Sequence, residues 1–300
     1  MTVPSATVSK ASVIFNPNGS VSAAAIREAL SAAGLRDFRW AETTAEDTGT
    51  GQARSALADG ADLVVVCGGD GTVRAVLSVL AGTGVPLAVL PCGTGNLLAR
   101  NYGIPLLIGA AAQLTTRGRR QRVDIGIIGD MRFAVMAGIG FDAAFLDNAP
   151  PGLKRWLGWA AYVVSGIRTL RHSPLATFDI RLDGSPEPIR RRGRGVLVAN
   201  VGQLQGGLEL LPGAAADDGR FEIGLLAPRR LRDWWGLMWR VVWKRRPHPW
   251  QLETWSASRV AITVDRKLPV ELDGDVGAEQ RELVAAVDPA SLVLCVPADG

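Results

Sequence analysis

The segment 63-LVVVCGGDGTVRAVLSVL-80 joins a short apolar run to a helical pattern through a glycine-rich turn. The apolar residues 63–67 predict a strand buried on both faces, and residues 73–80 have the apolar spacing of a helix. Glycine lets backbone N–H groups approach a phosphate closely, and the following helix adds the partial positive charge of its N-terminus. The stretch therefore predicts an anion site at Gly68, Gly69, Asp70, Gly71 and Thr72.

Short β-branched runs alternate with helical segments on both sides of this turn. Strands are expected at 12–15, 62–67 and 86–90, and helices at 22–33, 72–81 and 96–102. This alternation is typical of a parallel sheet wrapped by helices, and such sheets bind ligands beyond the carboxyl ends of their strands. The first third of the chain is therefore expected to form an α/β domain with its site at that edge.

Two further polar turns follow predicted strands. They are 16-NPNGS-20 and 93-GTGN-96. Thr94 can offer its hydroxyl to a phosphate or ribose, and Asn96 can cap the next helix, contact a ligand, or do both. Because three such turns follow strands of the same sheet, the sequence predicts one shared nucleotide site.

The carboxylate of Asp70 lies inside the predicted phosphate-binding turn. Two negative groups in one turn repel each other unless a cation lies between them. Asp70 therefore suggests Mg²⁺, held directly or through water. A plain strand-to-helix turn is the alternative interpretation of the GGDGT sequence.

The sequence is richer in strands from about residue 122 onward. Strands are expected at 122–128, 132–137, 176–182, 195–201, 220–226, 259–264 and 292–296, with helices at 153–171 and 229–243. Short strands separated by Gly, Pro and Asp predict a β-sandwich-like second domain. We place a nucleotide-binding domain at 1–127 and a β-rich domain at 128–300, whose last strand can return to the first domain.

The composition is that of a globular protein with an anionic partner. A chain of 300 residues with 47% hydrophobic content can bury the cores of two domains. A pI near 9.3 and clustered arginines favour nucleotide, nucleic acid or a membrane surface as partner. The three cysteines lack CxxC spacing and are expected to be reduced core residues. We recognise no signal peptide and no apolar stretch of about 18 to 20 residues, which predicts a cytoplasmic or peripherally membrane-associated protein.

Residues 228–246 combine a helical stripe of apolar side chains with basic flanks. Seven Lys and Arg residues accompany one acidic residue, Asp233. Trp beside Arg and Lys is typical of an interfacial helix, since aromatic rings favour the headgroup boundary. We predict that this helix, together with Trp156 and Trp159, docks the protein on an anionic membrane surface. Packing of the same stripe on the β-rich domain is the alternative.

Seven blocks of the chain resemble the diacylglycerol kinase catalytic-domain family, which includes bacterial diacylglycerol kinases and sphingosine and ceramide kinases. The blocks are an NPxG-like start at Asn16, GGDGTV at 68–73, GTGN at 93–96, VDIG at 123–126, AGIGFDA at 137–143, LPGAAADDGRFEI at 211–223 and LDGD at 272–275. They run through most of the chain in the family's order. GGDGT alone also occurs in NAD kinases, but the later blocks favour lipid kinases.

The resemblance implies a Rossmann-like first domain, related to phosphofructokinase and NAD kinase, a β-sandwich-like second domain, and the use of ATP and Mg²⁺. The implied nucleotide contacts are Asn16, Thr44 (or Thr43), Gly68, Gly69, Asp70, Gly71, Thr72, Val73, Arg74, Gly93, Thr94 and Asn96. Asp70 and Asp124 would organise catalytic Mg²⁺. A structural Mg²⁺ would bind the Asp218 carboxylate and the carbonyls of Ala215 and Arg220, with a plain Asx-type turn as the alternative.

The general base of this family comes from a DGE motif, whose last position aligns with Asp275. Aspartate is one methylene shorter than glutamate, so Asp273 is a second candidate for taking the acceptor's proton. A plain acidic turn at 273–275 is the alternative. Arg74 stands where many relatives have Asn, and Leu97 where many have Asp, which changes the surroundings of the predicted Mg²⁺.

The expected activity is transfer of the γ-phosphoryl group of ATP to a membrane lipid, with diacylglycerol as first choice and a sphingoid base or ceramide as the alternative acceptor. An NAD kinase-like enzyme and a catalytically inactive lipid or nucleotide sensor are the competing functions. Nucleic acid is not expected as a partner, because the basic runs match no binding motif. A homodimer is compatible with the sequence.

Overall fold

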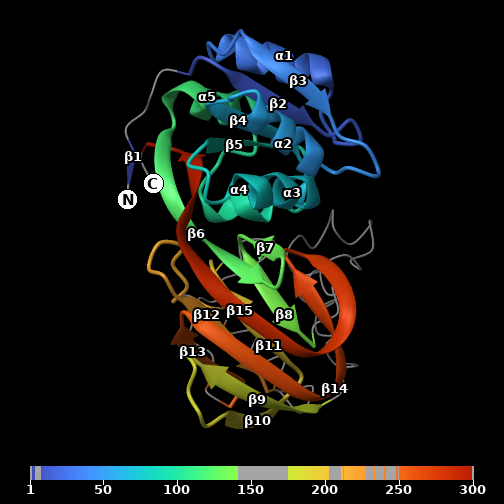
Figure 1. Cartoon of the computed structure of the whole chain (residues 1–300), viewed down its shortest axis with the longest axis vertical. Helices are drawn as coiled ribbons and strands as arrows, with labels where there is room; N and C mark the ends of the chain where they lie inside the picture. The colour runs from blue at the N-terminus through green and yellow to red at the C-terminus, as the bar shows by residue number, and fades with distance from the viewer. Residues whose placement is uncertain are drawn as a thin grey trace. The chain divides into compact units, whose positions relative to one another are not determined.

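The computed structural model describes residues 2–3, 8–140, 175–202, 211, 213–227, 233, 240, 248 and 250–298. The chain divides into two compact units, whose elements are labelled in Figure 1. Unit 1 consists of Met1–Ile125, Ala216–Gly219 and Asp288–Gly300, and unit 2 of Gly126–Ala215 and Arg220–Val287.

Unit 1 contains a parallel sheet with the strand order β3-β2-β4-β5-β15. Its strands are β2 (Ala11–Phe15), β3 (Phe38–Glu42), β4 (Leu63–Gly68), β5 (Pro86–Pro91) and the end of β15 (Asp275–Val296). Two short or peripheral strands, β1 (Thr2–Val3) and β6 (Arg119–Ile128), pair with each other. Every residue of β2 and β4 is buried, as expected for strands covered on both faces.

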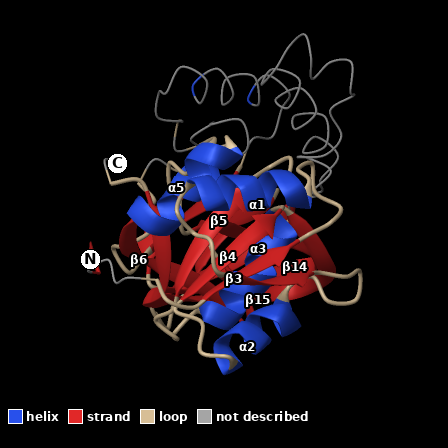
Figure 2. Ribbon diagram, turned by 90° about the horizontal axis from the view of Figure 1, so that it is seen from above, coloured by secondary structure: helices blue, strands red, loops and turns tan. Residues whose placement is uncertain are grey.

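Helices cover both faces of this sheet (Figure 2). Helix α1 (Ala23–Ala32) packs beside α5 (Ile108–Arg117), and α2 (Thr50–Ala58) packs beside α3 (Asp70–Leu80) on the other face. The short helix α4 (Leu97–Asn101) follows β5. The predicted α/β domain is confirmed.

Unit 2 is built from antiparallel strands. Neighbours in order are β13 (Leu252–Ala257), β12 (Phe221–Leu226), β11 (Gly195–Ala199), β8 (Met136–Ile139), β14 (Arg259–Leu272) and β15; β7 (Met131–Phe133), β9 (Ala176–Leu182) and β10 (Ile189–Gly193) complete the set. Residues 260–264 of β14 pair with β9, and residues 270–272 pair with β8. A register shift between Thr263 and Leu268 accompanies this change of partner. Such a switch lets two sheets face one another across a single core.

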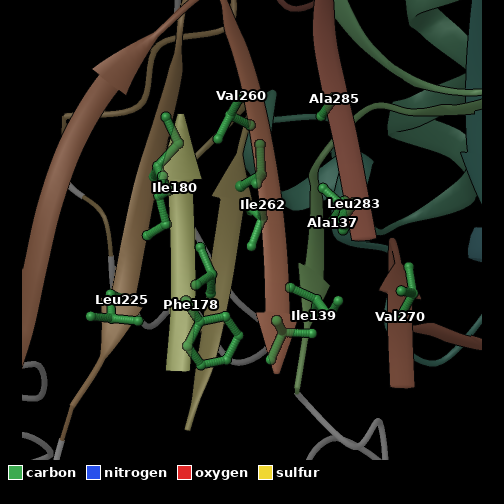
Figure 3. Close-up of a cluster of buried hydrophobic side chains, with 14 of the residues drawn as sticks. Ala137, Ile139, Phe178, Ile180, Leu225, Val260, Ile262, Val270, Leu283 and Ala285 are labelled. Atoms are coloured by element: carbon green, nitrogen blue, oxygen red, sulfur yellow. The ribbon is translucent and has the colours of Figure 1, made fainter. Parts of the chain in front are cut away.

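One apolar cluster fills unit 2 (Figure 3). Phe178 and Ile180 of β9, Ile262 of β14, Leu225 of β12 and Ile139 of β8 are all buried in it. Alternate residues of β9 are buried, which is the period of a strand with one face toward a core. The predicted β-sandwich-like domain is confirmed.

The structure corrects one predicted strand and adds others. The single strand predicted at 132–137 is wrong: β7 ends at Phe133 and β8 begins at Met136. Between them, the N–H groups of Ala134 and Val135 donate to the Asp273 carboxylate at 2.9 Å each, which diverts them from the ladder. Strands β3, β10 and β13 and helix α5 were not predicted. None of the residues of β3 is fully buried, so its apolar pattern is weak.

Candidate active site

The loops that follow β2, β4 and β5 meet at the carboxyl edge of the parallel sheet. Asn16 Nδ2 donates to Thr72 Oγ1 at 3.1 Å, and the backbone N–H of Ser20 donates to the Cys92 carbonyl at 3.1 Å. The loop after β2 therefore contacts both glycine-rich loops. The three polar turns singled out in the sequence lie together.

The two glycine-rich loops touch through their backbones. A Cβ added to Gly93 would lie 2.5 Å from Gly69 Cα, and a Cβ added to Gly68 would lie 2.7 Å from Thr72 Cβ. Positions 68 and 93 therefore require glycine. Gly69 is the N-cap of α3, so the first turn of this helix presents backbone N–H groups and its positive dipole end at the junction of the loops. This arrangement can bind a polyphosphate.

Asp70 has a structural role that the sequence does not reveal. Its carboxylate oxygens accept the backbone N–H groups of Asn96 at 2.9 Å and Leu97 at 2.7 Å. The carboxylate thereby caps α4 and fixes the 93–96 loop against α3. These donors also offset part of the repulsion between Asp70 and a bound phosphate, so a cation is not the only physical reason for an acid here.

Asn96 closes its own loop. Its backbone lies in the left-handed region, with φ 49° and ψ 47°. Its Oδ1 accepts the Gly93 N–H at 3.1 Å, and its Nδ2 donates to the Gly93 carbonyl at 2.8 Å. The interpretation of the Asn96 side chain as the helix cap is wrong, because Asp70 supplies the cap. Thr94, between these residues, is exposed.

Of the two candidate threonines after β3, Thr43 is buried and Thr44 is exposed. Thr44 Oγ1 accepts the Asp47 N–H at 3.1 Å. The backbone N–H of Glu46 and the Thr44 hydroxyl together lower the pKa of the Glu46 carboxyl. A nucleotide contact at Thr44 would therefore replace its bond to Glu46. Arg74 lies half-buried in the second turn of α3.

Asp124, the second predicted Mg²⁺ ligand, ties distant segments of unit 1 together. It is 3% exposed, and its carboxylate accepts the N–H groups of Gly219 and Ala290, each at 2.7 Å. Its own N–H donates to the Ala216 carbonyl at 2.7 Å. These contacts hold the turn at 216–219 and the segment after 288 onto β6. Asp124 thus lies at the turn predicted for the structural Mg²⁺, in which Asp218 is exposed.

The acids of unit 1 are compatible with a metal ion that is held mainly by the phosphates of a bound substrate. Within the described ranges, no group of three or more His, Cys, Asp or Glu side chains is placed to hold a metal ion. Mg²⁺ usually keeps several waters and is bound by one or two carboxylates together with substrate phosphates. Asp70, inside the turn predicted to bind phosphate, fits one such carboxylate. The set of Asp218 with the carbonyls of Ala215 and Arg220 stays a prediction.

The two candidate bases in unit 2 differ in their surroundings. Asp273 and Gly274 join β14 to β15 and have φ angles of 48° and 94°, both positive as a type I′ turn requires. Asp273 is 7% exposed, and its carboxylate accepts three backbone N–H groups, those of residues 134–136, at 2.9 Å each. Asp275, at the start of β15, is exposed. Of the two carboxylates, therefore, it is Asp275 that a substrate can reach.

The groups that hold these loops in place were not predicted from the sequence. The Ser20 hydroxyl donates to the Cys92 carbonyl at 3.0 Å, beside the bond from its N–H. Its position in the polar turn 16–20 was the available signal. No signal separated Asp273 from Asp275, because the partners of Asp273 lie more than a hundred residues away in sequence.

The protein-family model of the diacylglycerol kinase catalytic domain matches residues 10–128. The protein-family model of the YegS C-terminal NAD kinase beta sandwich-like domain matches residues 135–296. A Pseudomonas putida protein named "Probable lipid kinase YegS-like" is 34% identical over 275 residues, which cover 88% of each chain. The chain belongs to the diacylglycerol kinase catalytic-domain family. The resemblance inferred from the motifs is thereby confirmed.

Other members of the family match over different lengths. A Mycobacterium tuberculosis protein named "Diacylglycerol kinase" is 35% identical over 179 residues, 56% of each chain. The solved structure of a diacylglycerol kinase from Bacillus anthracis str. Sterne has a TM-score of 0.78 at 22% identity, covering 98% of this chain and 99% of that chain, and it shares the fold. Across the first curated relatives, the aligned part spans between 33% and 88% of the relative's own length.

Several predicted features lie outside the described residues. They are residues 141–143 of the AGIGFDA block, the helix at 153–171 with Trp156 and Trp159, and the segment 228–246 apart from Asp233 and Arg240. Among the helices that the structure describes, none is long and apolar enough to cross a membrane.

Proposed function

We propose that the chain is an ATP- and Mg²⁺-dependent lipid kinase that transfers the γ-phosphoryl group of ATP to a lipid hydroxyl. Diacylglycerol is the expected acceptor and phosphatidic acid the product. The observation that carries the proposal is the backbone contact between Gly69 and Gly93 at the start of α3, which supplies a cradle for a polyphosphate. The family and the names of its M. tuberculosis and P. putida members support a lipid acceptor.

The residues of unit 1 would bind and orient the nucleotide. Backbone N–H groups at the start of α3 would hold phosphate oxygens, and the exposed Thr94 hydroxyl would bind a phosphate or the ribose. Asn16 holds Thr72 in place through their side-chain bond. Mg²⁺ bound beside Asp70 would neutralise charge on the transferring group. Phosphoryl transfer depends mainly on such positioning.

Asp275 would take the proton of the acceptor hydroxyl as the hydroxyl oxygen bonds to the γ-phosphorus and the bond from that phosphorus to the leaving ADP breaks. Its exposure supports this role. Asp273 would act by holding residues 134–136 and the turn, because its carboxylate already accepts three N–H groups.

The proposed acceptor is a membrane lipid, so the enzyme would work at a membrane surface. We extend the proposal to peripheral association with an anionic membrane through residues 228–246, which carry seven Lys and Arg residues. Action from the cytoplasm, a homodimer and the absence of a nucleic-acid partner stay predictions.

The decisive experiment is transfer of labelled γ-phosphate from ATP, with Mg²⁺, to diacylglycerol, ceramide and a sphingoid base in mixed micelles, and separately to NAD. Asp275→Asn is compared with Glu279→Gln, which changes another exposed acid of β15. Labelled lipid that is lost in Asp275→Asn and kept in Glu279→Gln supports the proposal. Labelled NADP alone, or tight ATP binding with no labelled lipid, contradicts it in favour of an NAD kinase or a sensor.

A further inference from the structure

Two adjacent leucines are exposed where α5 begins. Leu106 is 42% exposed and Leu107 is 78% exposed. The other exposed large apolar side chains of the described ranges are Met131, Trp250 and Val276, and none of these is next to another in sequence. Single exposed apolar residues are common on soluble proteins, whereas contiguous exposed apolar surface marks an interaction site.

Leu107 stands where a polar residue would stabilise the fold. It is the N-cap of α5, with extended backbone angles and no side-chain bond to the helix. Ser, Thr, Asp and Asn are strongly preferred at this position, because their oxygens accept the first N–H groups of a helix. A leucine that is both solvent-exposed and poor as a cap contributes little to folding. Its place in the sequence therefore points to a contact outside the chain.

The leucines lie at the same edge of unit 1 as the candidate nucleotide site. The Thr116 hydroxyl, near the end of α5, donates at 2.8 Å to the carbonyl of Ala33, just after α1. The packed helices α1 and α5 therefore run in the same direction. Helix α1 follows β2, so it begins at the carboxyl edge of the sheet, and α5 begins there too.

The charge around the leucines favours an anionic partner. Residues 70–124, which include α3, α4 and α5, contain six arginines, with Asp70 and Asp124 as the only acids. Arg100 of α4 is exposed and lies six positions before Leu106 in the sequence. The neighbouring helix α1 carries one Arg and one Glu, which cancel. Apolar side chains beside basic ones are what binding to anionic lipid requires.

We propose that Leu106 and Leu107 insert into the headgroup region of an anionic phospholipid membrane and hold the carboxyl edge of the unit 1 sheet at the lipid surface. The inference rests on the proposed function, since a lipid kinase must meet its acceptor at a membrane. The proposed contact is separate from residues 228–246. The two leucines lie in the domain matched at residues 10–128, and that segment lies in the domain matched at residues 135–296.

The test is sedimentation with sucrose-loaded vesicles of phosphatidylglycerol and phosphatidylcholine, without ATP. Leu107→Ser and Leu106→Ser are compared with Met131→Ser, which removes an apolar side chain that is 47% exposed in unit 2. Each leucine variant should lower the partition coefficient about tenfold, which corresponds to about 1.4 kcal/mol. Met131→Ser should bind like the wild type. Vesicles of phosphatidylcholine alone should bind the wild type less.

Thermal unfolding separates this effect from damage to the fold. Because serine is a better N-cap, Leu107→Ser should melt at the wild-type temperature or about 2 to 4 °C above it, while it loses vesicle binding. A structural role for Leu107 predicts the opposite change in melting temperature. Leu106→Ser provides a second variant away from the cap.

Three results would overturn the inference. They are a wild type that does not sediment, a Leu107→Ser variant that sediments like the wild type, and a wild-type dimer that Leu107→Ser converts to monomer without changing sedimentation. Phosphorylation of a water-soluble short-chain diacylglycerol is measured in parallel. If neither the wild type nor any variant has this activity but the leucine substitutions still reduce sedimentation, the proposed function fails and the membrane contact stands.

Discussion

Replacing Asp273 and Asp275 separately by Asn should distinguish a carboxylate that stabilises the fold from one that acts in catalysis. The Asp273 carboxylate accepts three backbone N–H groups: Oδ2 accepts that of Ala134, and Oδ1 accepts those of Val135 and Met136. In Asp273→Asn, an amide Nδ2 would face one of these donors and could not accept from it. Asparagine tolerates the positive φ of 48° at this turn, so the turn itself is preserved.

The expected loss of stability follows from these three bonds. One bond to a charged acceptor, with a net value of about 1.5 to 3 kcal/mol, is lost, and two others become neutral and weaken by about 1 kcal/mol each. Asp273→Asn should therefore lower the free energy of unfolding by about 4 kcal/mol, a large share of the roughly 5 to 15 kcal/mol of a typical protein. Asp275 is exposed, so Asp275→Asn should change stability by less than about 0.5 kcal/mol.

Catalytic activity should show the reverse pattern, with the larger loss in Asp275→Asn. Asp275→Asn should lower turnover about 10²- to 10⁴-fold, the usual contribution of a general base. Asp273→Asn should keep most of its turnover per folded molecule at low temperature. Urea unfolding followed by circular dichroism gives the stabilities, and transfer of labelled phosphate to the lipid gives the rates. A stable but inactive Asp273→Asn beside an active Asp275→Asn would refute the assignment.

Gly93→Ala should weaken ATP binding at least tenfold in a calorimetric titration, because its Cβ would lie 2.5 Å from Gly69 Cα; Gly109→Ala, with open space around its Cβ, is the control. Asp70→Asn should lose about 1 to 2 kcal/mol of stability to urea without nucleotide, since it weakens the cap of α4, and an unchanged midpoint would leave Asp70 with a purely ligand-directed role. Burial raises the pKa of the Cys92 thiol from 9.0 to about 11. The stability that this thiol contributes should be intact below pH 9 and decline as pH rises to 11, and a thiol reagent at pH 8 should label the native protein slowly. Rapid labelling at pH 8 would contradict its burial.

Strong local patterns made the fold predictable. The strands β2, β4 and β5 are apolar runs buried on both faces, and glycine-rich turns mark their carboxyl ends. By contrast, β3 lies at the edge of the sheet with no fully buried residue, so periodicity could not find it. The break between β7 and β8 was also invisible, because it depends on a carboxylate from the β14–β15 turn.

The candidate site was predictable as a place but not in its internal contacts. The glycines in turns 68–72 and 93–96 predict that backbone segments approach closely there, and the structure places these turns in contact. The Asn96 side chain has the chemistry of a helix cap, yet the left-handed backbone at this residue turns it back to Gly93. Local propensity cannot decide between two partners when one of them, the Asp70 carboxylate, comes from another loop.

Three of the acids predicted for chemistry are also anchors for backbone amides. The carboxylates of Asp70 and Asp124 each accept two N–H groups, and that of Asp273 accepts three. In every case the donors lie in a segment distant in sequence, so each acid joins loops that no local pattern relates. A carboxylate held in this way is fixed in place, which suits an acid that orients a site more than one that must accept a proton. Asp275, exposed at the start of β15, has the access that proton transfer needs. The exposure of Asp275 and the three backbone donors on Asp273 therefore favour the proposal that Asp275 acts in catalysis and Asp273 in positioning.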